Sequence, residues 1–271
     1  MSKWHPFGGR ISRHFGDSSS SLAPPDAYLS YYDVRLTKED VDSLKSDWLT
    51  DNVIAFWEEY LEHEKLPHFP RANIVLLRPS MAFMLLNASD PRDLASALPS
   101  FSGTTHIFLP VNDCHDPNRA EGGTHWSLLV VSVLDGVAFH YDSMGASNRS
   151  DAAALARHFA ALLGRELRFV HLEDSPQQQN GSDCGVFVCL IMQHLLLGRL
   201  LTSGPGGKVN MSMEGKEVDA SGGRKEIMRL IEAFRKEGER RRSSSMGRSR
   251  SRGKATPSRS PPRIGEENDP A

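Results

Sequence analysis

The sequence predicts an α+β domain, in which helices and strands are mixed along the chain. Three observations support this prediction: runs rich in β-branched residues in the middle of the chain, an amphipathic helical pattern before them, and an almost entirely apolar helical stretch after them. With 271 residues, 39% of them apolar, the chain can bury the core of one domain of about 200 residues.

The first predicted helix begins after Thr50, a residue suited to the N-cap. Residues 105–111 and 125–134 are rich in β-branched and aromatic residues and are predicted to be strands. Residues 137–142 follow the pair Asp135-Gly136, so the last two strands should form a hairpin. One face of the first helix is marked by apolar residues at helical spacing, namely Val53, Phe56, Trp57, Tyr60 and Leu61.

A second helix is predicted over residues 152–163, closed by Gly164, with a short strand over 168–172 after it. Residues 185–200 are apolar on nearly every face, which is typical of a helix buried in the centre of a domain. The Gly/Ser-rich residues 203–223 are predicted to be a loop. A last amphipathic helix is indicated by Ile227, Leu230, Ile231 and Phe234.

Both ends of the chain differ in composition from the part between them. Residues 1–26 end in a Ser/Pro stretch and are predicted to be a flexible extension, followed by one domain over residues 27–238. Residues 239–271, rich in Arg and Ser, are predicted to be a disordered tail. Residues 240–263 hold nine basic and no acidic residues, so the formal charge of −2 becomes −11 without them. If the chain contacts nucleic acid, we expect this tail to do so; a solvated extension is the alternative.

Composition argues against several classes of protein. No run approaches 18 uncharged apolar residues and residues 1–20 lack the apolar core of a signal peptide, so we expect an intracellular monomer, in the cytoplasm or the nucleus, without membrane contact. Three cysteines do not make a disulfide framework. Because Cys184 and Cys189 are five residues apart and Cys114 is distant, neither a metal site nor a cofactor is expected.

The stretch Q-Q-N-G-S-D-C-G-V-F-V-C at residues 178–189 places Cys184 at the predicted start of the long apolar helix. The unpaired N–H groups of a first helical turn carry partial positive charge and favour a thiolate over a thiol. Cys184 is therefore a candidate nucleophile, whereas Cys189, inside the helix, is expected to be a core residue. Gly185 would leave room for a substrate backbone beside the thiol.

A cysteine nucleophile needs a base and a third group that orients the base. His125 opens one predicted strand and Asp142 ends the next, so the hairpin could present both to Cys184. A two-residue turn would leave Asp142 opposite Leu129, about 13 Å from His125, so a longer connection or a bulge has to shift the register. Gln178 could offer a side-chain amide to a developing oxyanion, together with the Cys184 N–H.

Each of these residues also has an ordinary structural explanation. A lone cysteine beside an apolar helix is more often a core residue, Asp142 could cap a turn, and Gln178 could be one polar loop residue among several. Among the other histidines, surface or satisfied core positions are expected for His140, His171 and His194.

Three motifs resemble those of the ubiquitin-like-protein-specific cysteine proteases, the family of SUMO proteases and deneddylases. They are H-W-S-L-L-V at 125–130, F-H-Y-D-S at 139–143 and Q-Q-N-G-S-D-C-G at 178–185. The resemblance implies a papain-like fold with a mixed sheet and a buried helix that carries the nucleophile. It also implies that Cys184 attacks the carbonyl after a diglycine, that His125 is base and then acid, that Asp142 orients His125, and that Gln178 helps to form the oxyanion hole.

The resemblance extends upstream to D-W-L-T-D-N at residues 47–52, with Thr50 where the family usually has Asn. It implies that Trp48 and Trp126 line a narrow tunnel that admits only Gly-Gly, because a Cβ would collide with an indole. It further implies that Asp51 contacts the incoming modifier. The structural alternatives are two core tryptophans and a carboxylate that favours a helix dipole.

The segment V-N-D-C-H-D-P-N-R-A-E-G-G-T-H-W at residues 111–126 resembles the deneddylase branch of the family. We therefore expect the neddylation modifier and its conjugates as partners, with precursor processing and isopeptide cleavage both open. Three alternatives remain: a SUMO protease of the same mechanism, a module that binds a ubiquitin-like protein without cleaving it, and acyl transfer to an amine by the same Cys and His.

Overall fold

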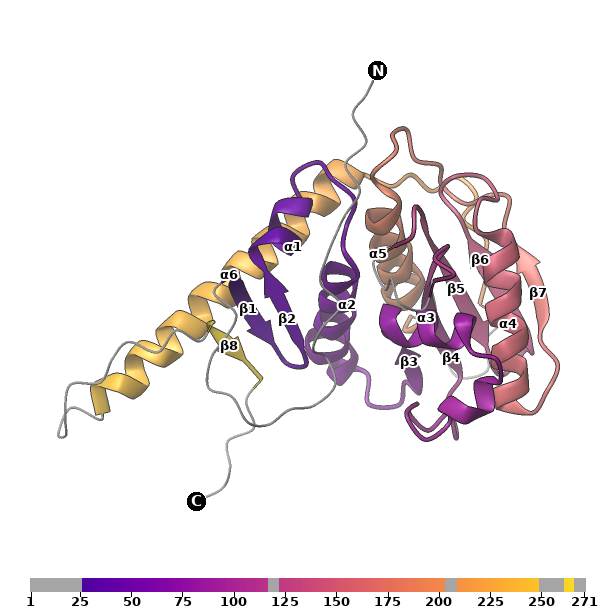
Figure 1. The fold of residues 1–271 in the computed structure, drawn as a ribbon, viewed down its shortest axis with the longest axis horizontal. Coiled ribbons are helices and arrows are strands. Elements are labelled where there is room, and N and C mark those ends of the chain that lie inside the picture. Colours follow the sequence, from indigo (N-terminus) through magenta and orange to yellow (C-terminus); the bar gives the residue numbers. More distant parts are fainter. Residues whose placement is uncertain (1–25, 117–121, 203–208, 249–260, 266–271) are drawn as a thin grey trace.

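The computed structural model describes residues 26–116, 122–202, 209–248 and 261–265, which form an α+β domain with two sheets. Figure 1 shows the five-stranded sheet in one half of the molecule and the three-stranded sheet, with α6 (Ala220–Arg248), in the other. Helices α2 (Asp51–Tyr60) and α5 (Cys184–Leu195) lie between the two sheets and pack against each other. The predicted fold class is confirmed.

The five-stranded sheet has the order β3-β4-β5-β6-β7 and is mixed. Strands β4, β5 and β6 are antiparallel neighbours, while β3 and β7 add parallel strands at the two edges. The strand bounds are β3 (Ile74–Leu76), β4 (His106–Asn112), β5 (Trp126–Ser132), β6 (Val137–Tyr141) and β7 (Arg168–His171).

Both faces of this sheet are covered, because β4 and β5 carry apolar residues at nearly every position and cannot leave one face to water. Phe108, Leu128 and Val130 face the core shared with α2 and α5. Their neighbours Leu109 and Leu129 face a second core under α3 (Pro79–Asn87) and α4 (Arg149–Leu163). The sheet therefore separates two hydrophobic cores.

The register of the β5–β6 hairpin positions the ends of both strands. Ser132 pairs with Val137, so the connection has four residues and not the two of an ideal turn. Pairing ends at Leu128–Tyr141, which leaves Asp142 at the level of Ser127, two residues from His125. The longer connection thus supplies the register shift that the sequence required.

The long apolar helix is central, as predicted. Nine of the twelve residues of α5 are buried, and the π-helical turn η4 (Leu196–Leu200) continues it. Helix α2 lies beside it, and the Trp57 Nε1 donates a hydrogen bond to the Cys189 carbonyl at 2.9 Å. This bond fixes the position of α5 along α2.

Thr50 is the N-cap of α2 and accepts a hydrogen bond from the Val53 N–H at 3.4 Å, which confirms that prediction. Helix α4 starts at Arg149, three residues before the predicted start, and ends at Gly164 with a φ of 62°. The other elements are β1 (Ala27–Tyr31), β2 (Val34–Thr37), α1 (Lys38–Ser43), η1 (Leu61–Lys65), η2 (Leu66–His68) and η3 (Pro91–Leu94).

The prediction of a disordered tail over residues 239–271 is wrong in two parts. Helix α6 does not end near residue 238 but continues to Arg248, and its polar turns carry ion pairs such as Arg241–Glu237 at 3.0 Å. The predicted loop is also shorter, because α6 already begins at Ala220. Residues 1–25, 249–260 and 266–271 lie outside the described residues, so the remaining predictions for both ends stay predictions.

The second difference is strand β8 (Arg263–Ile264), which adds to the three-stranded sheet in the order β2-β1-β8. The Ser30 N–H donates to the Pro262 carbonyl and the Tyr32 N–H to the Ile264 carbonyl, both at 2.9 Å. Ile264 is 7% exposed and packs in the main core. Ile264, an isolated apolar residue in a polar segment, thus docks this segment on the domain, which composition alone could not reveal.

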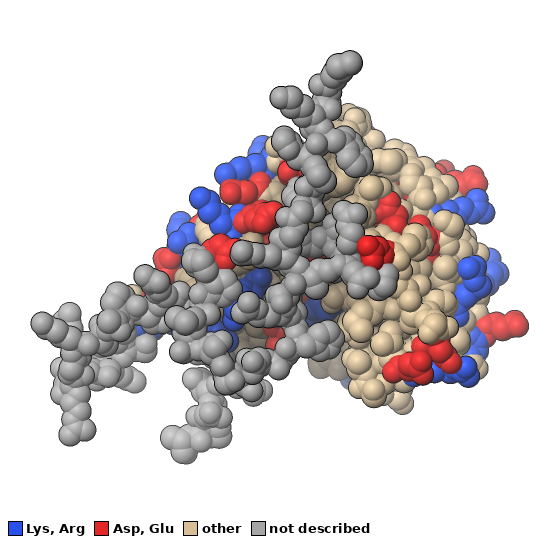
Figure 2. Space-filling model, viewed as in Figure 1, with Lys and Arg blue, Asp and Glu red and all other residues tan. Residues whose placement is uncertain are grey.

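Charged side chains of both signs are mixed on the face seen in Figure 2, along α6 and around the edges of the five-stranded sheet. Ion pairs on this helix, such as Arg235–Glu239, account for part of that mixture. Among the described helices none is both long and apolar enough to span a membrane.

Substituting Ile264→Asp should release β8, because a carboxylate cannot remain in the apolar core. The amides of Ser30 and Tyr32 should then exchange with deuterium at least tenfold faster in the otherwise folded protein, an order-of-magnitude expectation for the loss of two strand hydrogen bonds. Arg263→Lys, which keeps the charge of the neighbouring side chain, serves as the control. Unchanged protection of both amides in Ile264→Asp would contradict the docked strand.

Candidate active site

Cys184 is the first residue of α5 and is 1% exposed. Asp183, the N-cap residue, precedes it, and Gly185 follows. A Cβ at Gly185 would lie 2.9 Å from the Leu49 Cβ, so the missing side chain makes room for Leu49. The expected room for a substrate backbone at this glycine is therefore filled by the protein itself.

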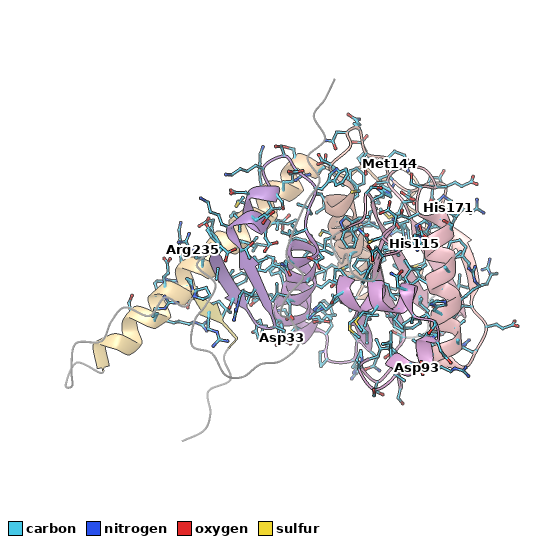
Figure 3. All side chains as sticks on the ribbon, viewed as in Figure 1. Asp33, Asp93, His115, Met144, His171 and Arg235 are labelled. Atoms are coloured by element: carbon cyan, nitrogen blue, oxygen red, sulfur yellow. The ribbon has the colours of Figure 1, made fainter. Side chains whose placement is uncertain are left out.

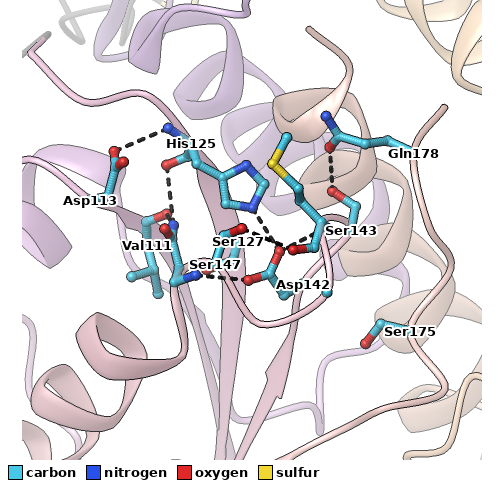
Figure 4. A network of polar contacts seen from close by, with 12 residues as sticks. Val111, Asp113, His125, Ser127, Asp142, Ser143, Ser147, Ser175 and Gln178 are labelled. Carbon is cyan, nitrogen blue, oxygen red and sulfur yellow. Dashed lines mark hydrogen bonds and ion pairs between the residues drawn. The ribbon is translucent and has the colours of Figure 1, made fainter. Parts of the chain in front are cut away.

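His125 and Asp142 are brought together by the hairpin, with the His125 Nε2 2.7 Å from the Asp142 Oδ1 (Figure 4). The ionised carboxylate only accepts hydrogen bonds, so Nε2 carries the hydrogen that it donates. Nδ1 makes no hydrogen bond among the described residues, and the thiol of Cys184 is close enough to the ring to help raise the pKa of His125. This is the arrangement that a cysteine nucleophile, its base and an orienting carboxylate would have, and the three roles remain predictions.

The ring of His125 is held in its charged form. Burial by itself lowers the pKa of His125, but the hydrogen bond to Asp142 and the interaction with Cys184 outweigh burial and raise this pKa to about 9. Burial also raises the pKa of Asp142, but hydrogen bonds from His125 and from the N–H groups of Asn148 and Met144 hold it below its usual value. At neutral pH the pair is therefore imidazolium and carboxylate.

Asn148 is a site residue that sequence reasoning missed. Its backbone N–H donates to the Asp142 Oδ2 at 2.9 Å, and its side-chain amide donates to the carbonyls of His125 and Val111, both at 3.2 Å. It therefore fixes the carboxylate and the backbone of the histidine together. The available signal was its place as N-cap of α4, four residues before the predicted start of that helix.

Asp113 was also missed, although it lies in the quoted V-N-D-C segment. Its Oδ1 accepts hydrogen bonds from the N–H groups of Thr124 and His125, the latter at 3.0 Å (Figure 4). The loop that leads into β5 is thereby joined to the end of β4. These bonds fix the backbone from which the histidine ring projects.

Gln178 lies in the loop that precedes α5 and is joined to the residue after Asp142. Its backbone N–H donates to the Ser143 carbonyl at 2.8 Å, its Oε1 accepts from the Ser143 hydroxyl at 2.7 Å, and its Nε2 donates to the Asn180 carbonyl at 2.7 Å. Gln177, missed from the sequence, donates to the Asp142 carbonyl at 2.9 Å. The predicted role of Gln178 with an oxyanion remains a prediction, but its amide is held in one orientation.

The two predicted tunnel tryptophans occupy different environments. Trp48 is 40% exposed, and its Nε1 donates to the Gly181 carbonyl in the loop before Cys184. Trp126, at the start of β5, is 9% exposed and packs in the main core. Asp51 is the first residue of α2, where its Oδ1 accepts from the Asn52 N–H at 2.7 Å. Asp51 thus lies where a carboxylate favours the helix dipole, which was the structural alternative to a contact with the modifier. The tunnel between Trp48 and Trp126 remains a prediction.

The residues assigned to packing behave as predicted. Cys189 is fully buried, and burial raises the pKa of its thiol well above the ordinary value. His140 is buried with one ring nitrogen 3.0 Å from the Ser127 hydroxyl and the other 3.0 Å from the ring of His171. Within the described part of the chain, no group of three or more His, Cys, Asp or Glu side chains could hold a metal ion.

The raised pKa of His125 depends on the charge of Asp142, so Asp142→Asn should lower it. We expect the wild-type imidazole to titrate near pH 9 and the variant at least one pH unit lower, roughly the effect of one buried hydrogen-bonded charge. NMR titration of the His125 ring protons measures both values. A variant that still titrates near pH 9 would mean that Asp142 does not hold the charged ring.

Comparisons with known proteins identify relatives and a fold. The chain is 38% identical over 227 residues to NEDD8-specific protease 2 of Schizosaccharomyces pombe, which covers 80% of the chain and 54% of that protein. It is 37% identical over 166 residues to sentrin-specific protease 8 of Homo sapiens, covering 59% of the chain and 76% of that protein. The chain thus spans about half the length of the fission yeast relative.

The C-terminal Ulp1 protease domain solved in complex with Smt3, the yeast ortholog of SUMO, superimposes with a TM-score of 0.54. It is 20% identical to this chain and covers 76% of it and 86% of the solved domain, which establishes a shared fold. The model of the Ulp1 protease family, C-terminal catalytic domain, matches residues 47–205, more than half of the 271 residues. The chain therefore belongs to the Ulp1 protease family.

Proposed function

We propose that the chain is a cysteine protease that hydrolyses the bond after the C-terminal Gly-Gly of a ubiquitin-like modifier, with NEDD8 as that modifier. The observation that supports it best is the buried His125–Asp142 pair at 2.7 Å with Cys184 interacting with the same ring. A raised histidine pKa and a thiol at a helix N-terminus are the conditions under which a thiolate–imidazolium pair forms.

The cleavage is a two-step acyl transfer. The Cys184 thiolate attacks the carbonyl carbon of the last glycine and forms a C–S bond, while the electron pair moves to the oxygen. The Cys184 N–H and the second N–H of the Gln178 amide stabilise this oxyanion. When the intermediate collapses, the C–N bond breaks and His125 gives its proton to the leaving amine. Neutral His125 then takes a proton from water, whose oxygen attacks the thioester and releases the modifier carboxylate and the thiolate.

The surface around the site has features suited to a protein substrate. Two of the exposed large apolar side chains, Trp48 and Met144, belong to the segments that border the site, with exposures of 40% and 42%. Figure 3 shows Met144 at the edge of the molecule, on the loop that follows Asp142. The Trp48 indole donates to the Gly181 carbonyl in the loop before Cys184, which supports a role of Trp48 beside the nucleophile. A modifier bound over both would bring its tail to Cys184.

NEDD8 is favoured over SUMO by the names of the relatives at higher identity. The fission yeast protein named for NEDD8 is 38% identical to the chain, whereas the SUMO-bound protease domain is 20% identical and supports the fold alone. A module that binds without cleaving would not need an oriented histidine beside a thiol, and all four proposed catalytic residues are present. Acyl transfer to an amine differs from hydrolysis only in the second nucleophile, so a product analysis distinguishes the two.

The choice of modifier can be measured with matched substrates. C-terminal fluorogenic derivatives of NEDD8, SUMO and ubiquitin should differ in kcat/KM by at least about tenfold in favour of NEDD8, a modest discrimination for a protein-sized contact. A preference for SUMO would reverse the proposed specificity and leave the mechanism standing. No hydrolysis of any of the three would reject the protease.

Cys184→Ala should lower kcat by roughly 10⁴-fold or more, because it removes the nucleophile of the whole unit. A NEDD8 derivative with an electrophile at its C-terminal glycine should label the wild-type protein and not this variant, as read by a mass increase on an SDS gel. Cys189→Ala, which removes a buried thiol from the same helix, is the matched control and should still be labelled. Equal labelling of Cys184→Ala would place the nucleophile elsewhere.

The pH dependence follows from the pKa of His125, which is raised to about 9. Below this value the ring is charged and can give a proton to the leaving amine, and above it the ring is neutral and cannot. The rate kcat/KM should therefore fall about tenfold per pH unit above roughly pH 9. In Asp142→Asn the falling limb should move to lower pH, and an unmoved limb would assign it to another group.

A further inference from the structure

Arg224 is a buried cation close to the proposed nucleophile and outside the residues that match the family model. It lies near the start of α6, is 7% exposed, and follows the matched region of 47–205 by nearly 20 residues. Isolated guanidinium groups are costly to bury, so a buried arginine is expected to have several acceptors.

The guanidinium of Arg224 joins two segments of the chain. Its Nε donates to the Asp183 Oδ1 at 2.8 Å, and its Nη2 donates to the Ser182 carbonyl at 2.9 Å. Its Nη1 donates to the Ser43 carbonyl, at the end of α1, at 3.0 Å. Asp183 completes the arrangement by accepting a hydrogen bond from the Asn180 side-chain amide at 2.8 Å.

Arg224 and Trp48 both bond to the loop before Cys184, at different residues of it. The Trp48 indole donates to the Gly181 carbonyl, and Leu49 fills the space beside Gly185. The segment that carries Trp48 follows α1, whose last residue Ser43 accepts from Arg224. Arg224 is thus bonded both to the loop before Cys184 and to the end of α1, the helix that precedes Trp48.

The charge of Arg224 matters as well as its geometry. Asp183 is the immediate neighbour of Cys184, and an uncompensated carboxylate there would oppose a negative sulfur. Arg224 neutralises this carboxylate through the ion pair. The charged and titratable groups around Cys184 include His125, with Asp142 hydrogen-bonded to it, the adjacent residue Asp183, and Arg224, which pairs with Asp183.

We propose that Arg224 is a positioning residue of the active site, which fixes the loop 180–184 against the end of α1 and cancels the charge of Asp183 beside the nucleophile. This proposal rests on the proposed role of Cys184 as a reactive thiolate. It does not depend on which modifier is cleaved. Arg224, a residue of α6, thereby helps to set the reactivity of Cys184.

The charge role is tested by the pH dependence of Cys184 alkylation with iodoacetamide, followed by mass spectrometry of the peptide that contains it. In Arg224→Gln the midpoint pH should rise by roughly half a unit to one unit, the effect of one uncompensated charge on an adjacent residue. The double variant Arg224→Gln/Asp183→Asn should return the midpoint to the wild-type value or below. Lys225→Gln, which removes a positive charge from the next, exposed position of α6, should leave it unchanged.

The positioning role is tested by turnover of the NEDD8 fluorogenic substrate. Arg224→Lys keeps the charge but cannot bond all three acceptors, so its alkylation midpoint should stay within about 0.3 pH unit of wild type while kcat falls about tenfold or more. KM should change by less than about threefold, since the modifier surface is untouched.

Thermal unfolding of each variant separates these effects from loss of the fold. An unchanged midpoint pH of Cys184 alkylation in Arg224→Gln would overturn the charge role. So would a raised alkylation midpoint that the added Asp183→Asn substitution does not reverse. An unchanged kcat in folded Arg224→Lys would overturn the positioning role. Alkylation needs no modifier, so a failure of the proposed protease function would be seen separately, as absent hydrolysis with normal alkylation.

Discussion

The structure of the site depends on the burial of one carboxylate. Asp142 is 0% exposed, and a buried charge of this kind is stable only when donors surround it. Its donors come from three places: the His125 ring just before β5, the Met144 N–H two residues after Asp142, and the Asn148 N–H at the start of α4. Satisfying one charge therefore fixes the histidine, the loop after β6 and the direction of α4 at once.

Cys184, the proposed nucleophile, is positioned by a different force, namely the packing of an apolar helix. Helix α5 is buried between α2 and the five-stranded sheet, so hydrophobic contacts fix its axis, and the Trp57 bond to the Cys189 carbonyl fixes its position along that axis. Arg224 and Trp48 then bond to the loop before Cys184, at Ser182 and at Gly181. Polar contacts at the helix start and apolar contacts along its length together place the thiol beside His125.

Much of the fold was readable in the sequence because local patterns have local causes. The β-branched and aromatic residues of the hairpin strands, the N-cap at Thr50, the turn at Gly164 and the apolar surface of residues 185–200 are each properties of a few neighbouring residues. Strand β8 could not be read in this way, because Ile264 lies between Arg263 and Gly265 and is stabilised by contacts with α6 and with β1, the latter more than two hundred residues earlier. The same holds for Arg224, whose acceptors include Ser43.

For the site, the sequence determined which residues are proposed to react: a thiol at a helix start, a histidine and a carboxylate at the ends of paired strands, and an amide six residues before the thiol. It could not determine whether His125 meets Asp142, because a hairpin connection of two or four residues changes the register and no local pattern distinguishes them. Only the tertiary structure decided this distance, the filling of the space at Gly185 by Leu49, and the contacts of Asn148. Each joins residues that are distant along the chain, and their proximity results from the packing of the whole domain.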